Sequence, residues 1–274
     1  MLKCVRHWLS YDLHPDTVAQ IPAAYPDLIK LIFDLKPELC RNQAKCISSL
    51  IMSTAGKQIS PALETAKQNI GLKVTSLVSS LDRVIESKNE NLIRGFQTIF
   101  TTLCRTYIDK VLEDTSSELY IVMLKLLRCS KDRNEDICMF WKLLFKEIYG
   151  IKDMKIKVEK VVALKAIISE LVLTCLAKSQ LSDEIFMELN KKSDNDEEFA
   201  ELVDQRFCYG GILKYIGACI GARNFWTVIS GRVKTDFDNI GANPGVPANW
   251  ASLESTLFCI SELLICKLMN LCLR

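Results

Sequence analysis

The chain has 274 residues, of which 49% are hydrophobic and 25% are charged. These values are typical of a folded chain and exclude disordered, collagen-like and low-complexity proteins. The 35 Lys and Arg residues nearly balance the 33 Asp and Glu residues, and the net charge is +2. This balance argues against direct binding of nucleic acid, because a protein that coats nucleic acid needs a dense basic face.

The first half of the chain shows helical periodicity. Tyr25–Leu35 is predicted to be a helix that ends at Lys36-Pro37, since the residue before a proline is pushed out of the α region. A longer helix is predicted over Asn89–Glu113, and a short break then leads into Glu118–Arg128. The longer helix carries an apolar stripe at helical spacing, which consists of Leu92, Phe96, Ile99, Phe100, Leu103 and Tyr107.

The second half continues as helices separated by short turns. The predicted helices are Glu135–Tyr149, Lys155–Lys178, Glu197–Ile220, Ala222–Thr235 and Trp250–Arg274. Two longer loops are expected at Ser179–Asn195 and Asp236–Asn249. The expected core stripes are Ile137, Phe140, Trp141, Leu144 and Ile148 in the first of these helices, and Leu253, Leu257, Ile260, Leu264 and Leu268 in the last.

This order of elements predicts an all-α fold. Short connections make consecutive helices antiparallel, and helix pairs that recur every ~40–47 residues are typical of HEAT or armadillo arrays. We therefore expect one α-α superhelix over residues 1–274, with about six helical hairpins. A globular helical bundle is the structural alternative. The last predicted helix is apolar on more than one face, so we expect the middle of a longer solenoid.

The twelve cysteines are dispersed, and none forms a C-x-x-C pair. This pattern predicts free thiols that act as small hydrophobic residues in a reducing compartment. The N-terminus lacks the apolar core of a signal peptide. The most hydrophobic tract, Val161–Ala177, contains Lys165 and Glu170, which argues against a membrane span. We expect a soluble intracellular protein.

Signatures of catalysis and of cofactor binding are not found in the sequence. The chain has two histidines, His7 and His14, and Cys4-x-x-His7 supplies at most half of a metal site. No phosphate-binding glycine loop and no serine nucleophile elbow occur. The sequence therefore predicts a protein that is not an enzyme and that binds neither metal nor cofactor. An all-α enzyme with an unfamiliar site is a third alternative.

Two charged clusters are candidate partner-binding sites. The acidic cluster consists of Asp194, Asp196, Glu197, Glu198 and Glu201. Carboxylates are favourable at a helix N-terminus, so helix capping and the docking of a basic partner are both open interpretations. The basic cluster consists of Lys152, Lys155, Lys157 and Lys160. Cations are unfavourable at a helix N-terminus. The two open interpretations of this cluster are therefore a solvated face and contact with an acidic partner.

Three motifs occur in a distinctive order. They are Phe96-x-x-Ile99-Phe100-x-x-Leu103-Cys104, Cys138-x-Phe140-Trp141-x-Leu143 and Trp250-x-x-x-Glu254-x-x-Leu257-Phe258. The last is similar to the W-x-x-x-E-A-x-L-F signature of the importin-β superfamily, with Ser255 in place of the alanine. The set resembles the transportin-SR, importin-thirteen and Mtr-ten branch. The resemblance implies that the signature residues lie in the core: Phe140, Trp141, Trp250, Glu254, Leu257 and Phe258.

The resemblance also implies a function in nuclear transport. A receptor of this superfamily binds protein cargo (such as SR-rich proteins in this branch), the Ran GTPase and Phe-Gly nucleoporins, and it shuttles between nucleus and cytoplasm. Cargo and Ran-GTP would oppose one another through different affinities for two curvatures of the solenoid. The alternative is a HEAT-repeat scaffold or adaptor unrelated to transport.

Overall fold

The computed structural model describes residues 2–9, 15–55, 61–114, 118–129, 135–181 and 197–272. Within these ranges all regular structure is helical and no strand occurs, which confirms the all-α class. The chain divides into two compact units, Met1–Phe140 and Trp141–Arg274. Among the described helices, none is both long enough and apolar enough to cross a membrane. The single superhelix over residues 1–274 stays a prediction.

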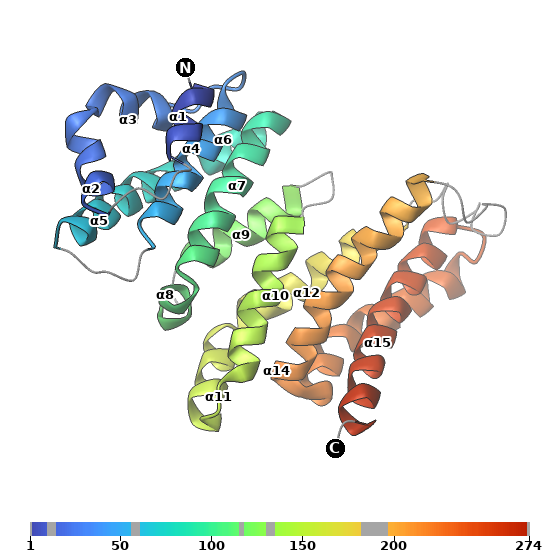
Figure 1. Ribbon diagram of the computed structural model, residues 1–274. Coiled ribbons are helices and arrows are strands. Elements are labelled where there is room, and N and C mark those ends of the chain that lie inside the picture. Colours follow the sequence, from blue (N-terminus) through green and yellow to red (C-terminus); the bar gives the residue numbers. More distant parts are fainter. Residues whose placement is uncertain are drawn as a thin grey trace. The chain divides into compact units, whose positions relative to one another are not determined.

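The first unit is built around the pair α4 and α7, on which α1, α3 and α9 pack, while α2 packs on α5 (Figure 1). Its helices are α1 (Leu2–Leu9), α2 (Pro15–Ala24), α3 (Pro26–Phe33), α4 (Cys40–Ser53), α5 (Pro61–Ser76), the 3-10 turn η1 (Leu77–Ser80), α6 (Leu81–Glu86), α7 (Glu90–Thr106), α8 (Ile108–Glu113), α9 (Glu118–Cys129) and the beginning of α10 (Glu135–Gly150).

The pairing of α4 with α7 depends on a glycine. A Cβ built on Gly95 would lie 2.2 Å from Sγ of Cys40, so a larger residue would require the Cys40 side chain or one of the two helices to shift. Asn89 caps α7, because its side chain accepts a hydrogen bond from Leu92 N at 3.1 Å. Phe96 and Phe100 of α7 lie with ring centroids 5.9 Å apart, and neither exceeds 1% exposure. The predicted stripe is therefore confirmed at these two positions.

The predicted helix Asn89–Glu113 is divided in the structure. Tyr107 leaves the helical conformation (φ −119°, ψ 38°) and separates α7 from α8. The break places the Tyr107 hydroxyl 2.5 Å from Oγ1 of Thr54, the residue that ends α4. Periodicity alone does not reveal this break, because the apolar rhythm continues across it.

The second unit contains the rest of α10 together with α11 (Met154–Ala163), α12 (Lys165–Lys178), α14 (Glu197–Ala242) and α15 (Pro247–Cys272). Helix α14 packs against both α12 and α15 (Figure 1, yellow to red). Gly221 interrupts α14 with φ 78° and ψ 157°, a conformation open essentially to glycine alone. The run thus consists of two helical segments, 197–220 and 222–242, with the boundary where the sequence predicts it.

Two expectations for this unit are wrong. The predicted helix Lys155–Lys178 is split at Leu164 (φ −89°, ψ 7°), whose side chain is buried. The predicted loop Asp236–Asn249 is largely helical, because α14 continues to Ala242 and α15 begins at Pro247. The reason is that Asp236, a residue typical of loops, is instead buried in a helix–helix interface. Most of the predicted loop Ser179–Asn195 lies outside the described residues.

The apolar stripe of α10 is fully buried. Ile137, Phe140, Trp141, Leu144 and Ile148 are all 0% exposed, as their spacing predicts. Each described cysteine is a free thiol, and those that are buried are Cys40, Cys46, Cys104, Cys138, Cys175 and Cys259. Burial raises the pKa of Cys104 to about 12, so this thiol stays neutral. The use of cysteine as a small hydrophobic residue is confirmed at these positions.

Candidate functional site

Helix α11 has no buried residue. Met154, Val158 and Val162 follow one another at four-residue spacing, so they share one face of the helix. Their exposures are 69%, 53% and 64%. The helix therefore exposes an apolar stripe to solvent, while its half-buried residues are Lys157, Lys160 and Val161.

Asp153 and Tyr149 hold α11 in this orientation. Oδ1 of Asp153 accepts hydrogen bonds from the backbone N–H groups of Lys155 at 2.8 Å and Ile156 at 3.3 Å. The Asp153 carboxylate also supplies the negative charge that favours a helix N-terminus. Nζ of Lys157 donates to the backbone oxygen of Tyr149 at 2.9 Å and lies 4.2 Å from the centroid of the Tyr149 ring. Together these contacts fix how α11 begins and which lysine faces the protein.

The lysines of the predicted basic cluster therefore fall into two groups, exposed and half-buried. Lys152 and Lys155 are exposed, and their side chains form no hydrogen bond or ion pair with any residue in the described part of the chain. Lys157 is committed to Tyr149. Residues 152–165 contain five lysines and two carboxylates, a local excess of three positive charges in a chain whose net charge is +2. The exposed residues Lys152, Met154, Lys155, Val158 and Val162 are called the α11 surface below.

The side chains of the predicted acidic cluster lie outside the part of the chain that the structure describes. Asp194 and Asp196 lie outside the described residues. Glu197, Glu198 and Glu201 belong to the first turns of α14, but their side chains also lie outside what the structure describes. The docking of a basic partner at these five positions stays a prediction.

The signature residues of the transport-receptor resemblance fall into two groups. Phe140 and Trp141 are fully buried, as expected of core residues. Trp250 and Leu257 are 42% and 50% exposed, which corrects their assignment to the core. The carboxylate of Glu254 accepts hydrogen bonds from Nη2 of Arg206 at 2.8 and 2.9 Å.

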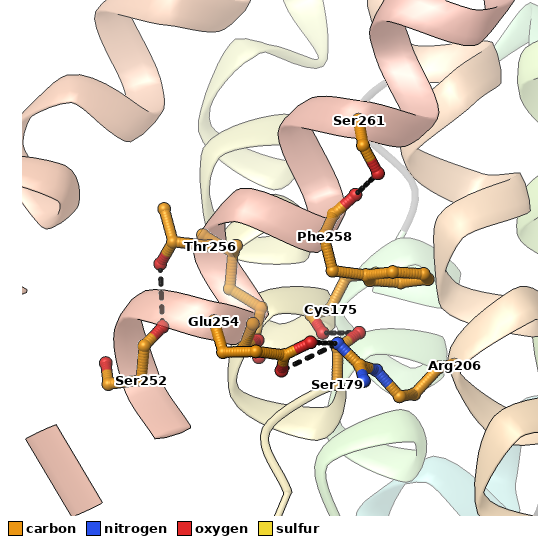
Figure 2. A network of polar contacts seen from close by, with 10 residues as sticks. Cys175, Ser179, Arg206, Ser252, Glu254, Thr256, Phe258 and Ser261 are labelled. Atoms are coloured by element: carbon orange, nitrogen blue, oxygen red, sulfur yellow. Dashed lines mark hydrogen bonds and ion pairs between the residues drawn. The ribbon is translucent and has the colours of Figure 1, made fainter. Parts of the chain in front are cut away.

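The pair formed by Arg206 and Glu254 is stacked on the remaining signature residue. The Arg206 guanidinium carbon lies 4.2 Å from the centroid of the Phe258 ring, and Figure 2 shows the three side chains together. The Arg206 side chain is 13% exposed. The contact therefore fastens α14 to α15.

The exposure of Leu257 follows from a polar interface between α14 and α15. Asp236 is 2% exposed and accepts hydrogen bonds from the hydroxyls of Ser252 at 2.6 Å and Thr256 at 2.9 Å. Nε of Arg232 lies 3.1 Å from the same carboxylate. Since α15 presents these hydroxyls to α14, Leu257 points away from the interface. From the hydrophobic pattern alone, Leu257 would be assigned to the buried face of α15.

Among the described residues, no group of three or more His, Cys, Asp or Glu side chains could hold a metal ion. The α11 surface presents exposed apolar side chains, flanked by lysines, to solvent. Comparison with protein families, curated proteins and solved structures finds no match to the chain.

Proposed function

We propose that the chain is a protein-binding helical scaffold and that the α11 surface is part of its binding face. The observation that carries this proposal is the orientation of α11, which exposes Met154, Val158 and Val162 while Lys157 contacts Tyr149. Isolated exposed apolar residues are common on proteins. Here three exposed apolar residues share one stripe of a helix that has no buried residue, and a cluster of exposed apolar residues marks an interaction site.

The architecture that we propose for this scaffold is the α-α superhelix of HEAT-like hairpins. It is supported by the packing of α12, α14 and α15 on one another and by the reversal at Gly221. Small-angle X-ray scattering separates this architecture from a globular bundle. A compact chain of this length has a radius of gyration of about 19 Å. We expect a clearly larger value, and a value near 19 Å would support the bundle.

Within this class we propose a nuclear transport receptor segment that binds protein cargo, Ran-GTP and Phe-Gly nucleoporins. The support is the ordered set of motifs, together with the role of Glu254, the acidic residue of the last motif, in joining α14 to α15 through Arg206. A HEAT-repeat adaptor unrelated to transport remains the second candidate, because the α11 surface suits either protein.

Two binding assays test the transport proposal. The chain is passed over beads that carry Phe-Gly repeats and over matched beads in which serine replaces each phenylalanine. Binding to Ran is measured in parallel with a GTP analogue and with GDP. We expect retention on the Phe-Gly beads alone and preference for GTP-loaded Ran. Equal retention on both bead types, together with equal binding of Ran in its two nucleotide states, would rule out the transport receptor and favour the adaptor.

A further inference from the structure

The shape of the α11 surface matches one face of a short partner helix. Met154, Val158 and Val162 extend over about 12 Å along the axis of α11, at 1.5 Å per residue. Side chains spaced four apart form a ridge, and a second helix receives such a ridge between its own rows of side chains. About two turns of a partner helix with apolar residues at the same spacing would cover the stripe.

The charges around the stripe select an acidic partner. Lys152 and Lys155 lie at the N-terminal end of the stripe, and the exposed Lys165 follows its C-terminal end. Two exposed carboxylates lie in this region: Asp153, whose Oδ1 accepts from the backbone N–H groups of Lys155 and Ile156, and Glu159, between the two ends. A partner with carboxylates at both ends of its apolar face would meet lysines there, whereas carboxylates at its middle would meet Glu159.

The composition of the stripe favours a peptide over a membrane. Helices that lie in a lipid interface carry large apolar residues such as Trp, Phe and Leu. The stripe of α11 has one methionine and two valines, and no Trp, Phe or Leu. Methionine is flexible and polarizable, and it is frequent on surfaces that adapt to a peptide.

From these features we propose that the α11 surface binds an acidic amphipathic helical peptide. The peptide lays its apolar face along Met154, Val158 and Val162, and its carboxylates pair with Lys152 and Lys155. This inference rests on the protein-binding function proposed above and specifies its partner. The stripe is small, so binding is expected in the micromolar range or weaker. The lysines are exposed, so added salt weakens the binding.

A designed peptide tests the proposal by fluorescence anisotropy. The probe is a labelled helical peptide with leucines four residues apart and glutamates at both ends of the leucine face. The control peptide has the same composition, with leucines and glutamates redistributed around the helix. We expect saturable binding of the probe, at least tenfold weaker binding of the control peptide, and a several-fold loss of affinity between 50 and 300 mM salt, roughly as screening of exposed charges predicts.

Variants at exposed positions separate the two parts of the surface. The combined Met154→Gln, Val158→Thr and Val162→Thr variant is expected to weaken binding at least tenfold. Lys152→Gln with Lys155→Gln is expected to weaken it several-fold and to reduce its salt dependence. Leu72→Gln with Lys73→Gln is the matched control, because these exposed residues lie on α5. That control should bind as the unchanged protein does, and all variants should keep its melting temperature.

Three results would overturn the proposal. The first is equal affinity of the unchanged protein and the stripe variant for the probe. The second is binding to vesicles with 30% phosphatidylserine but not to the probe. The third is self-association that the stripe variant abolishes, which would make a second copy of the chain the occupant. None of these results involves Phe-Gly beads or Ran, so failure here leaves the transport proposal to its own test.

Discussion

Arg206 and Glu254, 48 positions apart in the chain, join α14 to α15 through both oxygens of one carboxylate. The Arg206 guanidinium is covered on one side by the ring of Phe258. A charge withdrawn from water in this way is stabilised by its partner, and removing only one partner is costly because the other charge remains.

We expect Arg206→Met to lower the free energy of unfolding by about 2 kcal/mol. Loss of one member of a fully buried pair costs about 3–5 kcal/mol, but water can reach the Glu254 side chain, which is 35% exposed. Urea denaturation measures the change. Arg223→Met, at an exposed position of α14, is the control and should stay within about 0.5 kcal/mol of the unchanged protein. Equal effects of the two substitutions would contradict a role for the pair.

Asp236→Ala is expected to destabilise the second unit by about 3 kcal/mol. The substitution leaves the hydroxyls of Ser252 and Thr256 and the guanidinium of Arg232 without their shared acceptor at a buried position. Thermal unfolding and urea denaturation both report this change. The exposed neighbour Asp238 provides the comparison, since Asp238→Ala removes a carboxylate without touching the interface. A small effect at Asp236 would show that the network contributes little.

Two glycines of α14 are expected to respond to alanine with opposite signs. Gly221 has φ 78° and ψ 157°, so Gly221→Ala should cost about 1–3 kcal/mol even though a Cβ would meet no atom within 4 Å. Gly231 lies within a helical segment with equally open space, so Gly231→Ala should stabilise by about 0.5–1 kcal/mol. Urea denaturation of both variants tests the difference. The same sign for both would refute the break at Gly221.

Thiol labelling should distinguish the exposed cysteines from the buried ones. Cys4 is exposed, whereas Cys40, Cys46 and Cys104 are buried, and burial raises the pKa of Cys40 and Cys46 to about 11. Because the thiolate is the reactive form, we expect rapid labelling of Cys4 at pH 8 and labelling of the other three only in urea. Mass spectrometry of the labelled peptides identifies each site, and Cys4→Ser should remove the fast phase.

The free energy of unfolding should fall at alkaline pH. The pKa of Cys104 is raised from 9.0 to about 12, so the unfolded chain loses this proton before the folded chain does. The stability that comes from keeping this thiol protonated in the folded chain is fully present below pH 9. It is lost as the pH rises from 9 toward 12. Between pH 8 and pH 10 we expect a loss of about 1 kcal/mol from this residue. Urea denaturation of Cys104→Ala should show a shallower pH dependence than the unchanged protein, and an unaltered slope would contradict the assignment.

The sequence predicts those parts of the fold in which apolar spacing and local signals agree. Phe140 and Trp141 belong to a stripe whose members are all buried. The predicted helix begins at Asn89, and in the structure this residue caps α7. Gly221 marks a boundary because glycine adopts conformations that other residues avoid. Each of these signals depends on a few neighbouring residues, so it can be recognised without knowledge of the tertiary structure.

The remaining features depend on residues that are distant in the chain. The helical conformation around Asp236 requires hydroxyl donors from α15, and the exposure of Leu257 follows from the same contacts. The lysine cluster is visible in the sequence. Its division between exposed Lys155 and inward-facing Lys157 depends on the position of Tyr149 at the end of α10. Periodicity cannot supply such information, because it identifies faces but not the elements that cover them.

The hydroxyl-bearing face of α15 restricts how this helix can slide along its neighbour. A face lined only with leucine and valine could shift by one turn and still bury a similar apolar area. Asp236 accepts from both Ser252 and Thr256, which lie one turn apart, and both hydroxyls are buried. A shift by one turn would move one of the two donors out of reach and leave a buried oxygen unsatisfied. The interface thus encodes a single axial register for α15.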